Sequence, residues 1–589
     1  MPTVNVDQNF LFSELGRSYT TDEFRELCFE FGIELEEDTS ELAMAIEQIG
    51  EAAARAQGLS DKPLYKIDIP ANRYDLLCPE GIARALRIFL GLAKPPTFVV
   101  AKPKRTALHR ITIGEETQQI RPHIVGAVLR NITFTPDMYD SFIAMQDKLH
   151  HTICRRRTLV AIGTHDLDTV QGPFTYEALA PSKIKFAALN QTQPMSAPDM
   201  FAHFRANDKH IAKFLPIIEH SPVYPVVLDA NRVVCSLPPI INGDHSKITL
   251  NTKNVLVECT ATDLTKAKIV LNTIIATYSQ YCEHPFSVEP VEVVYPDGTM
   301  HVYPDVSSRP MSAEIDYITS AIGVDLSAHE VVEYLERMGL PSTLARNRRT
   351  VNVAVPITRS DVLHACDIME DVAIAYGYNK ITKTVPTVNT VGKPLPINKL
   401  SDLIRRELAL SGYSEVLPLT LCSTDENYAY LRREDPGSEA VVLANPKTVE
   451  YQVVRTTLLP GILKTLRENK SRPLPLNVFE VSDVVLRDES QERRARNERR
   501  VCVAYANKSS GFEIIHGVLG RLMKMLNVPL SEYSIRESFS ETFFPGRQAD
   551  VVYQGQVIGQ FGILHPEVVT AFEVNLPVTV LEMNLEPFL

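Results

Sequence analysis

The chain has 589 residues and a mass of 65.9 kDa. This is several times the common domain length of about 150 residues, so we expect several hydrophobic cores. Hydrophobic residues make up 44% and charged residues 22% of the sequence, which excludes a mainly disordered, collagenous or coiled-coil protein. No apolar stretch approaches the roughly 20 residues of a membrane span, and the amino-terminal residues lack a secretory signal pattern. We therefore predict a multidomain protein of the cytosol without membrane contact.

Cysteine spacing and net charge narrow the classes of partner. The nine cysteines contain no Cys-x-x-Cys pair, so the sequence predicts neither a zinc site nor a disulfide framework. A net charge of −12 gives no global reason to expect a nucleic acid, and any RNA contact must be local. The densest basic clusters are residues 155–157 and the arginines of residues 492–500. We predict solvated loops for both.

The most informative pattern is an internal repeat. Thr20 and Glu23 form a capping-box pattern ahead of an amphipathic helix that a glycine ends. Ser327 and Glu330 repeat this arrangement at an offset of 307 residues (327 − 20), again with a closing glycine. One ancestral unit, present twice, explains the agreement.

The repeat continues through a strand, a proline and an Arg-x-Asp step into a second helix. Arg73 and Asp75 correspond to Arg359 and Asp361 at an offset of 286 residues (359 − 73). The smaller offset gives the first copy 21 extra residues (307 − 286). We predict that residues 37–62, which lack a clear pattern, form a loop or insertion.

Only the second copy carries a carboxylate cluster. Asp361 has its counterpart in Asp75. At the same offset, Asp367, Glu370 and Asp371 correspond to non-acidic residues of the first copy. Like charges at these helical spacings each cost a few tenths of a kcal/mol, so another group should offset them. Mg²⁺ or a basic patch on a partner chain would do so, and an unpaired solvated face is the alternative.

The segment between the copies predicts an α+β domain. Apolar alternations over residues 124–129, 159–162, 226–234 and 255–257 indicate strands, and residues 137–153 and 263–281 indicate helices. Polar loops at the strand ends are the usual positions of functional sites.

Two histidines in these loops are candidate bases for hydrolysis. His165 has Asp166 and Asp168 nearby, and Asp244 precedes His245. Turn formation accounts for the same residues and is the interpretation that spacing alone favours. The sequence contains no nucleotide-binding glycine motif and no nucleophile elbow, so Mg²⁺ is the only cofactor that it suggests.

The last third of the chain predicts a mixed domain with an antiparallel sheet. An amphipathic helix covers residues 400–410, and helices at 458–468 and 512–526 flank the predicted strands. Gly555 and Gly559 are predicted turns. The strands are expected at residues 416–421, 477–485, 501–505 and 550–564.

Residues 359–379 resemble the B5 domain of phenylalanine-tRNA ligase beta subunits. The string begins Arg-Ser-Asp, continues through Asp-Ile-Met-Glu-Asp and ends Tyr-Gly-Tyr-Asn. The short amino-terminal layout is similar to the eukaryotic cytosolic form. Other segments that resemble this family are residues 69–75, 161–168, 239–244, 444–447, 455–461, 479–480, 544–547 and 564–566.

The resemblance implies an α+β, multidomain chain in a tetramer of two alpha and two beta subunits. Such an enzyme joins phenylalanine to tRNA(Phe) with ATP, and the alpha subunit binds ATP and phenylalanine. The implied Mg²⁺ positions are Asp361, Asp367, Glu370 and Asp371. The implied parts are a B1-like unit (1–95), an editing domain (108–285), a B5-like domain (300–384) and a class II synthetase-like domain (390–589).

The family's central domain hydrolyses tyrosine that has been attached wrongly to tRNA(Phe). Tyrosine differs from phenylalanine by one hydroxyl group, which an apolar pocket rejects only by about a hundredfold, so a second, hydrolytic site is useful. We expect the editing loops to position substrate and water through His165, Ser236, Asn242, Asp244, Glu258 and Thr260.

The carboxy-terminal domain departs from a working synthetase. Residues 455–458 lack the Arg-x-Glu of an ATP-binding loop, so we predict no aminoacylation site here and a role of the 400–410 helix in subunit packing. Two alternatives remain. One is a non-catalytic RNA-binding or assembly scaffold, and the other is a free-standing editing deacylase.

Overall fold

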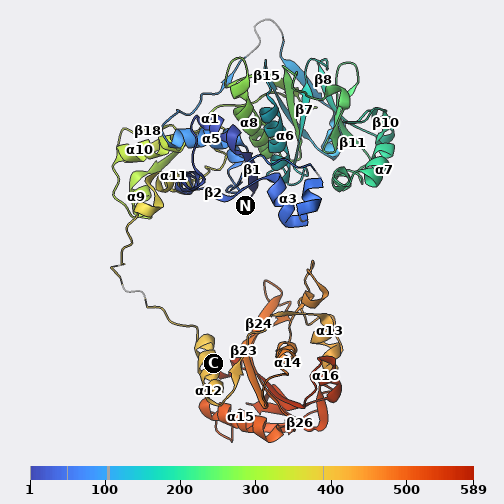
Figure 1. The fold of residues 1–589 in the computed structure, drawn as a ribbon, viewed down its shortest axis with the longest axis vertical. Coiled ribbons are helices and arrows are strands. Elements are labelled where there is room, and N and C mark those ends of the chain that lie inside the picture. Colours follow the sequence, from blue (N-terminus) through green and yellow to red (C-terminus); the bar gives the residue numbers. More distant parts are fainter. Residues whose placement is uncertain (1, 50, 57, 102–106, 386, 389–390) are drawn as a thin grey trace. The chain divides into compact units, whose positions relative to one another are not determined.

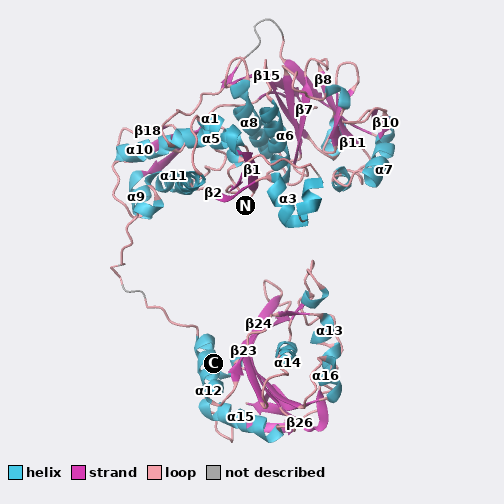
Figure 2. Cartoon of the chain, viewed as in Figure 1, coloured by secondary structure: helices cyan, strands magenta, loops and turns pink. Residues whose placement is uncertain are grey.

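The computed structural model describes residues 2–49, 51–56, 58–101, 107–385, 387–388 and 391–589 (Figure 1). The chain divides into two compact units, Met1–Thr384 and Val385–Leu589. Within the described ranges, no helix has the length and apolar character to cross a membrane. The expected α+β, multidomain fold class is confirmed (Figure 2).

The two repeat copies have the same order of elements. The first consists of β1 (Thr3–Asp7), α1 (Gln8–Leu15), α2 (Thr21–Phe31), β2 (Glu34–Thr39), β3 (Leu64–Asp68) and α5 (Pro79–Phe89). The second consists of β17 (Arg309–Glu314), α9 (Ile315–Ile322), α10 (Ala328–Arg337), β18 (Ser342–Leu344), β19 (Thr350–Val355) and α11 (Ala365–Tyr376). Their antiparallel sheets have the equivalent orders β1-β3-β2 and β17-β19-β18.

Both predicted capping boxes form. The Thr20 amide donates to Glu23 at 2.9 Å, and the Ser327 amide donates to Glu330 at 2.8 Å. Gly32 follows α2 with φ 92°, a left-handed conformation that glycine adopts without steric cost. The capping boxes fix where α2 and α10 begin, and Gly32 fixes where α2 ends, as the sequence predicted.

The prediction of a loop at residues 37–62 is wrong in part. The segment contains the end of β2 and two helices, α3 (Glu41–Ile49) and α4 (Glu51–Ala56). The Ser40 hydroxyl accepts from the Ala43 amide at 3.1 Å, as a helix cap does. Alanine and glutamate, which both favour helices, account for these short helices.

The two copies pack against each other reciprocally. Gly32 at the end of α2 lies against Ile374 of α11, 3.7 Å from the position of an added Cβ. Arg337 of α10 donates to the Phe89 carbonyl of α5 at 3.1 Å and lies 4.8 Å from the centre of its ring. Each copy therefore contributes its first long helix to contact with the second long helix of the other.

The middle domain is built on an 11-stranded sheet. Its main path is β13 (Ile241–Asn242), β12 (Val234–Leu237), β11 (Tyr224–Leu228), β8 (Phe174–Leu179), β5 (His109–Ile113), β15 (Ser287–Val294), β6 (His123–Leu129), β14 (Val255–Ala261) and β7 (Val160–Asp166). β4 (Val99–Val100) and β16 (Met300–Tyr303) pair with β15. The predicted helices are confirmed as α6 (Pro136–His151) and α8 (Leu264–Tyr278). The predicted strand 226–234 is instead two strands, because Asp229 accepts from the amides of Asn231 and Val233 and forms a turn.

The second unit has a sheet with a hydrophobic core on each face. Its order is β20 (Ser414–Glu415), β23 (Leu476–Arg487), β24 (Ala495–Ala506), β28 (Val578–Asn584), β27 (Gln556–Leu564), β26 (Phe543–Tyr553) and β25 (Tyr533–Glu537). Helices α12 (Pro396–Leu410) and α15 (Phe512–Met525) cover one face, and α14 (Leu459–Glu468) and α16 (Pro566–Ala571) cover the other.

Two expectations for this unit are corrected. Residues 416–421 do not form one strand, because only Leu421 joins the short strand β21 (Leu421–Cys422). Gly555 is the predicted turn, with φ 80°, but Gly559 lies within β27. A Cβ at Gly559 would lie 2.4 Å from the Glu582 carbonyl oxygen, so the glycine permits close strand approach instead of a turn.

Candidate functional site

A cavity of about 300 Å³ opens between α6, strands β7 and β14, and the loop at residues 238–242. This volume lies at the lower end for small-molecule sites and suits a ligand of amino-acid size. Half of its twenty lining residues are apolar and half are polar. The polar lining includes Gln146, His150, Arg157, Thr164, Asn242 and Glu258.

Glu258 of β14 is the centre of a buried polar cluster beside this cavity. Its side chain lies against Gly163 of β7, where an added Cβ would come within 2.1 Å of Glu258 Oε1. The Ser236 hydroxyl donates to the same oxygen at 2.9 Å. His165 Nε2 lies 3.8 Å from it, with its ring fully buried. The glycine on β7 therefore makes the room that the carboxylate needs.

Several polar atoms of this cluster have no hydrogen-bond partner among the described residues. They include Glu258 Oε2, His165 Nε2 and Thr260 Oγ1. His165 Nδ1 is engaged, 2.8 Å from the Ser246 hydroxyl. Buried polar groups are costly without partners, so these atoms are suited to hold a ligand or an ordered water.

The structure brings most of the predicted editing residues together. His165, Ser236 and Glu258 are in direct proximity, Thr260 lies two residues farther along β14, and Asn242 lines the cavity. Asp244 is not a lining residue, and its carboxylate accepts from the Asn190 amide at 2.8 Å.

The expected pairing of His165 with a neighbouring aspartate does not form. Asp166 accepts from the Thr252 hydroxyl at 2.6 Å, and Asp168 accepts from Asn254 at 2.9 Å. Alternation along β7 places His165 and Asp166 on opposite faces, and Asp168 lies beyond the end of the strand. The carboxylate near His165 instead comes from β14.

His150 lies at the buried end of α6 and lines the cavity, although it was not among the predicted site residues. Its Nε2 accepts from the Ile162 amide at 3.0 Å. Burial, with help from the charge of Arg157, lowers the pKa of His150 well below its ordinary value, so the ring is neutral. No local motif marks this residue, although a histidine on an apolar helix face was a usable signal.

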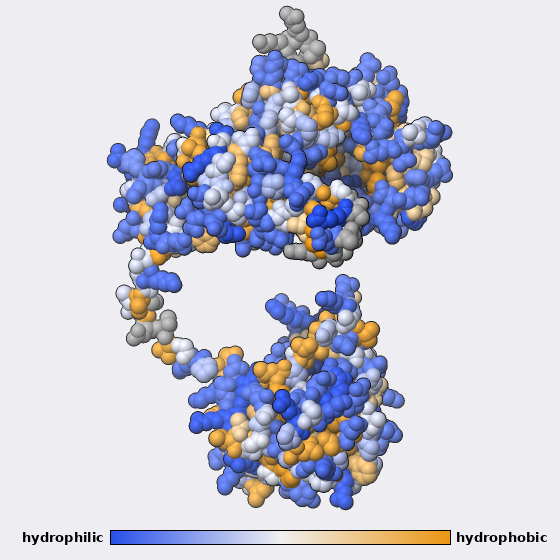
Figure 3. Space-filling model, viewed as in Figure 1, coloured by the Kyte–Doolittle hydropathy of each residue, from blue (hydrophilic) through white to orange (hydrophobic). Residues whose placement is uncertain are grey.

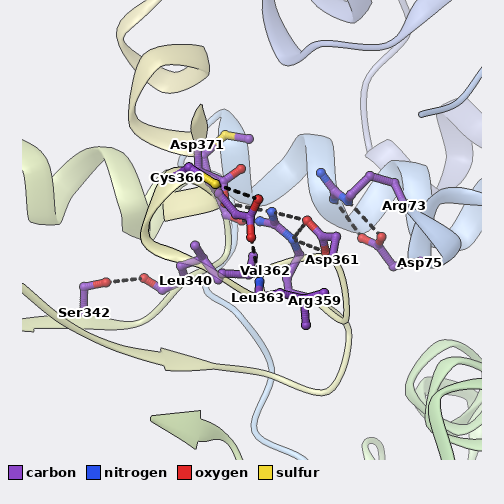
Figure 4. Close-up of polar contacts among 12 residues, drawn as sticks. Arg73, Asp75, Leu340, Ser342, Arg359, Asp361, Val362, Leu363, Cys366 and Asp371 are labelled. Atoms are coloured by element: carbon purple, nitrogen blue, oxygen red, sulfur yellow. Dashed lines mark hydrogen bonds and ion pairs between the residues drawn. The ribbon is translucent and has the colours of Figure 1, made fainter. Parts of the chain in front are cut away.

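The four carboxylates of the second copy lie in three environments. Arg359 Nη2 lies 2.7 Å from both Asp361 and Asp371 (Figure 4). Asp367 caps α11 by accepting from the Leu363 and His364 amides, each at 2.7 Å. Glu370 is exposed.

Burial and the shared arginine set the charges of this cluster. Burial raises the pKa of Asp371 to about 6, although Arg359 opposes the rise. Arg359 holds the pKa of Asp361 below its ordinary value despite burial. Because the guanidinium lies between Asp361 and Asp371, no cation binds both without displacing it. Across the ranges that the structure describes, no three or more His, Cys, Asp or Glu side chains converge as a metal site.

In the second unit, the arginine of residues 455–458 is committed to an internal ion pair. Arg455 lies 2.7 Å from Glu480, and both side chains are almost fully buried. Arg455 also donates to the Asp483 carbonyl at 3.1 Å. Burial raises the pKa of Glu480 to about 7, an effect that Arg455 opposes.

Sequence models of four domain families match consecutive parts of the chain. They are the Phe-tRNA synthetase beta subunit B1 domain over residues 1–92, the B3/4 domain over 105–282, the tRNA synthetase B5 domain over 311–378 and the phenylalanyl tRNA synthetase beta chain CLM domain over 381–585. The cavity lies in the B3/4 match, and the carboxylates lie in the B5 match.

Relatives match over the full length. A phenylalanine-tRNA ligase beta subunit of Drosophila melanogaster is 52% identical over 595 residues, covering 100% of both chains. One of Arabidopsis thaliana, named as cytoplasmic, is 48% identical over 607 residues, again covering 100% of both. A solved N-terminal fragment of the phenylalanyl-tRNA synthetase beta subunit from Pyrococcus horikoshii is 29% identical with TM-score 0.55, covering 64% of this chain and 99% of that chain.

These similarities confirm the resemblance stated from the sequence. They extend through both repeat copies, the middle domain and the second unit. The chain therefore belongs to the family of phenylalanine-tRNA ligase beta subunits, and is a subunit of that class II aminoacyl-tRNA synthetase.

Proposed function

We propose that the cavity of the middle domain hydrolyses tyrosine esterified to tRNA(Phe), and that an alpha subunit carries out the ATP-dependent attachment of phenylalanine. The observation that carries the proposal is the buried cluster of Glu258, Ser236 and His165 beside a cavity of about 300 Å³. A site with unpartnered polar atoms can hold a substrate hydroxyl or a water.

The chain's own groups act by positioning. Ser236 holds one oxygen of Glu258 through its hydroxyl, which leaves Oε2 as the acceptor for ligand or water. His150 stays neutral and contributes no charge to the cavity wall. Water is the nucleophile, so the hydrolysis requires a proton acceptor and a fixed geometry. Glu258 Oε2 is the acceptor, and the buried contacts of the cluster fix the geometry.

The test is hydrolysis of Tyr-tRNA(Phe) by the complex of this chain with its alpha subunit. Glu258→Gln keeps the shape and removes the charge, and we expect the hydrolysis rate to fall by about a hundredfold. Phenylalanine charging should stay within about twofold. Unchanged hydrolysis would exclude Glu258 from the site. A wild-type complex without hydrolysis would favour the scaffold alternative.

An alpha partner accounts for apolar side chains that the second unit exposes (Figure 3). Leu403 and Leu410 of α12 are 50% and 69% exposed, and Leu417 is 82% exposed. Apolar groups gathered at a surface are typical of interfaces. We expect a native mass of two alpha and two beta chains, and a double Leu403→Ser, Leu410→Ser variant that assembles less tightly.

Mg²⁺ is proposed at Asp367 and Glu370, one turn apart on α11. Mg²⁺ is usually held by one or two carboxylates, with waters completing its shell. This placement leaves Arg359 paired with Asp361 and Asp371, and the alpha subunit or water supplies the other oxygens. Glu370→Gln should raise the Mg²⁺ concentration needed for half-maximal assembly, whereas assembly without Mg²⁺ dependence would refute the site.

The cytoplasm is the proposed location, because the Arabidopsis relative carries that word in its name. Fractionation of cells that express the tagged chain tests this, and recovery in an organelle would contradict it.

A further inference from the structure

Three consecutive arginines adopt a left-handed backbone turn at the end of α6. Arg155, Arg156 and Arg157 have φ values of 47°, 52° and 67°. Each such residue costs roughly 1–2 kcal/mol when it is not glycine, so other contacts must hold the turn. It is the only run of three left-handed residues in the described part of the chain.

Hydrogen bonds from both sides hold this turn. The Leu159 amide donates to the Cys154 carbonyl at 3.1 Å, which closes the turn on itself. Arg121, only 1% exposed, donates to the carbonyls of Arg157 and Thr158 at 3.3 and 3.1 Å. Nη2 of Arg121 donates to the Thr260 carbonyl at 2.9 Å. Arg121 thereby connects the turn to the strand that carries Glu258.

The three side chains divide between the cavity and the solvent. Arg157 lines the cavity, donates to the Ile240 carbonyl at 3.0 Å and lies 4.2 Å from the centre of the Phe214 ring. Arg155 and Arg156 are exposed. Within the described ranges, the ion pairs of this domain include neither of them. Two arginines without an ion pair among the described residues therefore extend from a backbone turn that is held next to a residue of the cavity wall.

We propose that Arg155 and Arg156 bind backbone phosphates of the 3′-terminal strand of tRNA and so direct its aminoacyl ester into the cavity; this rests on the hydrolytic function proposed above. A chain of net charge −12 must meet a polyanion through a local basic element. Guanidinium groups bind phosphate through paired hydrogen bonds. The sequence pattern predicts a solvated loop here, and the turn beside the cavity gives this loop a role.

The experiment uses the complex of this chain with its alpha subunit and the double variant Arg155→Asn, Arg156→Asn. Asparagine tolerates the left-handed conformation, so the turn remains while both charges are lost. The matched control is Arg348→Asn, Arg349→Asn, since Arg348 is also exposed and left-handed, with φ 56°, but belongs to the second repeat copy.

We expect KM for Tyr-tRNA(Phe) hydrolysis to rise at least tenfold while kcat stays within twofold. The slope of log(kcat/KM) against log salt concentration should become shallower by about 1.4, since each lost single-strand phosphate contact removes about 0.7. Hydrolysis of tyrosine methyl ester, which has no phosphates, should be unchanged. The control variant should behave as wild type in all three assays.

Failure of the proposed hydrolytic function and failure of the phosphate assignment give different results. If the wild-type complex does not hydrolyse Tyr-tRNA(Phe), the proposed function fails first. If it does, and the double variant keeps the wild-type KM and salt slope, the phosphate assignment is wrong. A parallel loss with tyrosine methyl ester would also overturn the assignment, because it would show damage to the cavity itself.

Discussion

The two repeat copies share a fold but use the same helix face differently. In the first copy, Arg84 of α5 donates to the Ala276 carbonyl of α8 at 2.6 Å, and Glu80 accepts from the Ser141 hydroxyl at 2.6 Å. In the second copy, the residue equivalent to Arg84 is Glu370, which is exposed on α11. One face binds the chain's own middle domain, and the other exposes Glu370.

The copies also differ in how they neutralise a buried arginine. Arg73 contacts one carboxylate among the described residues, that of Asp75, with hydrogen bonds of 2.8 and 2.9 Å. Arg359 pairs with both Asp361 and Asp371. The second copy thus buries one more carboxylate than its arginine neutralises. Duplication kept the scaffold while substitutions on one helix changed the electrostatics.

The largest expected effect comes from removing the shared arginine. Arg359→Met leaves Asp361 and Asp371 without the arginine that they contact, and only the more distant charge of Arg73 still favours both carboxylates. We expect it to destabilise the chain by about 3–5 kcal/mol. Arg73→Met removes the contact partner of one carboxylate, Asp75, and should cost less. Urea unfolding followed by circular dichroism measures both. Equal losses would show that Asp371 does not depend on Arg359.

The two copies also differ in the space around the start of their second long helix. Gly81 of α5 corresponds to Asp367 of α11, and a Cβ at Gly81 would lie 1.8 Å from the Asp75 carbonyl oxygen. We expect Gly81→Ala to destabilise by about 1–3 kcal/mol through overpacking. Gly517→Ala in α15 is the control, because nothing lies within 4 Å of its added Cβ. Gly517→Ala should stabilise the chain by about 0.5–1 kcal/mol. A gain in stability for Gly81→Ala would contradict the predicted steric conflict with the Asp75 carbonyl.

Each copy also buries a carboxyl group whose pKa is raised. Burial raises the pKa of Asp371 to about 6 and that of Glu80 to about 7. A carboxyl with a higher pKa in the folded chain favours folding at low pH, and this contribution is lost as the pH rises through the folded pKa.

Stability should therefore decrease between about pH 4 and 7, by at most about 1.4 kcal/mol per pH unit for each group. Asp371→Asn should remove its share of the decrease up to about pH 6, and Glu80→Gln its share of the decrease up to about pH 7, to which Glu480 of the second unit also contributes. Melting temperatures of the variants across this range test the assignment. A wild-type pH profile in Asp371→Asn would show that this carboxyl does not titrate there.

The smallest effect on the folded chain should come from Glu370. Because its side chain is exposed, Glu370→Ala should change the free energy of unfolding by less than about 0.5 kcal/mol. Arg84→Ala at the equivalent position should cost about 1 kcal/mol, since the Ala276 carbonyl loses its donor. Thermal unfolding of both variants tests whether this face is occupied in one copy and open in the other.

Local chemistry made much of the fold predictable. The capping boxes at Thr20 and Ser327 and the left-handed Gly32 depend on residues a few positions apart, and the structure contains all of them. Predictions failed at short elements and at one close approach of two strands. The helix α3 and the turn at Asp229 depend on a local cap and a local turn that the sequence pattern did not reveal, whereas Gly559 reflects the approach of another strand.

The candidate sites show the same division. The family resemblance, applied to the polar loops, identified His165, Ser236 and Glu258 as candidates. The alternation of β7 and its pairing with β14 then made Glu258, and not Asp166, the carboxylate near His165. His150 and Arg121 carry no motif, because their roles come from packing between segments far apart in the chain.

The sequence by itself determined the duplication, the family and the identity of the charged residues, because each depends on residue order and local spacing. Only the tertiary structure decided which charges meet. It placed Arg359 between Asp361 and Asp371, and it left Glu370 exposed while Arg84 is used internally. Electrostatic contacts depend on distance in space, and distance in space between remote segments is set by the packing of the whole unit.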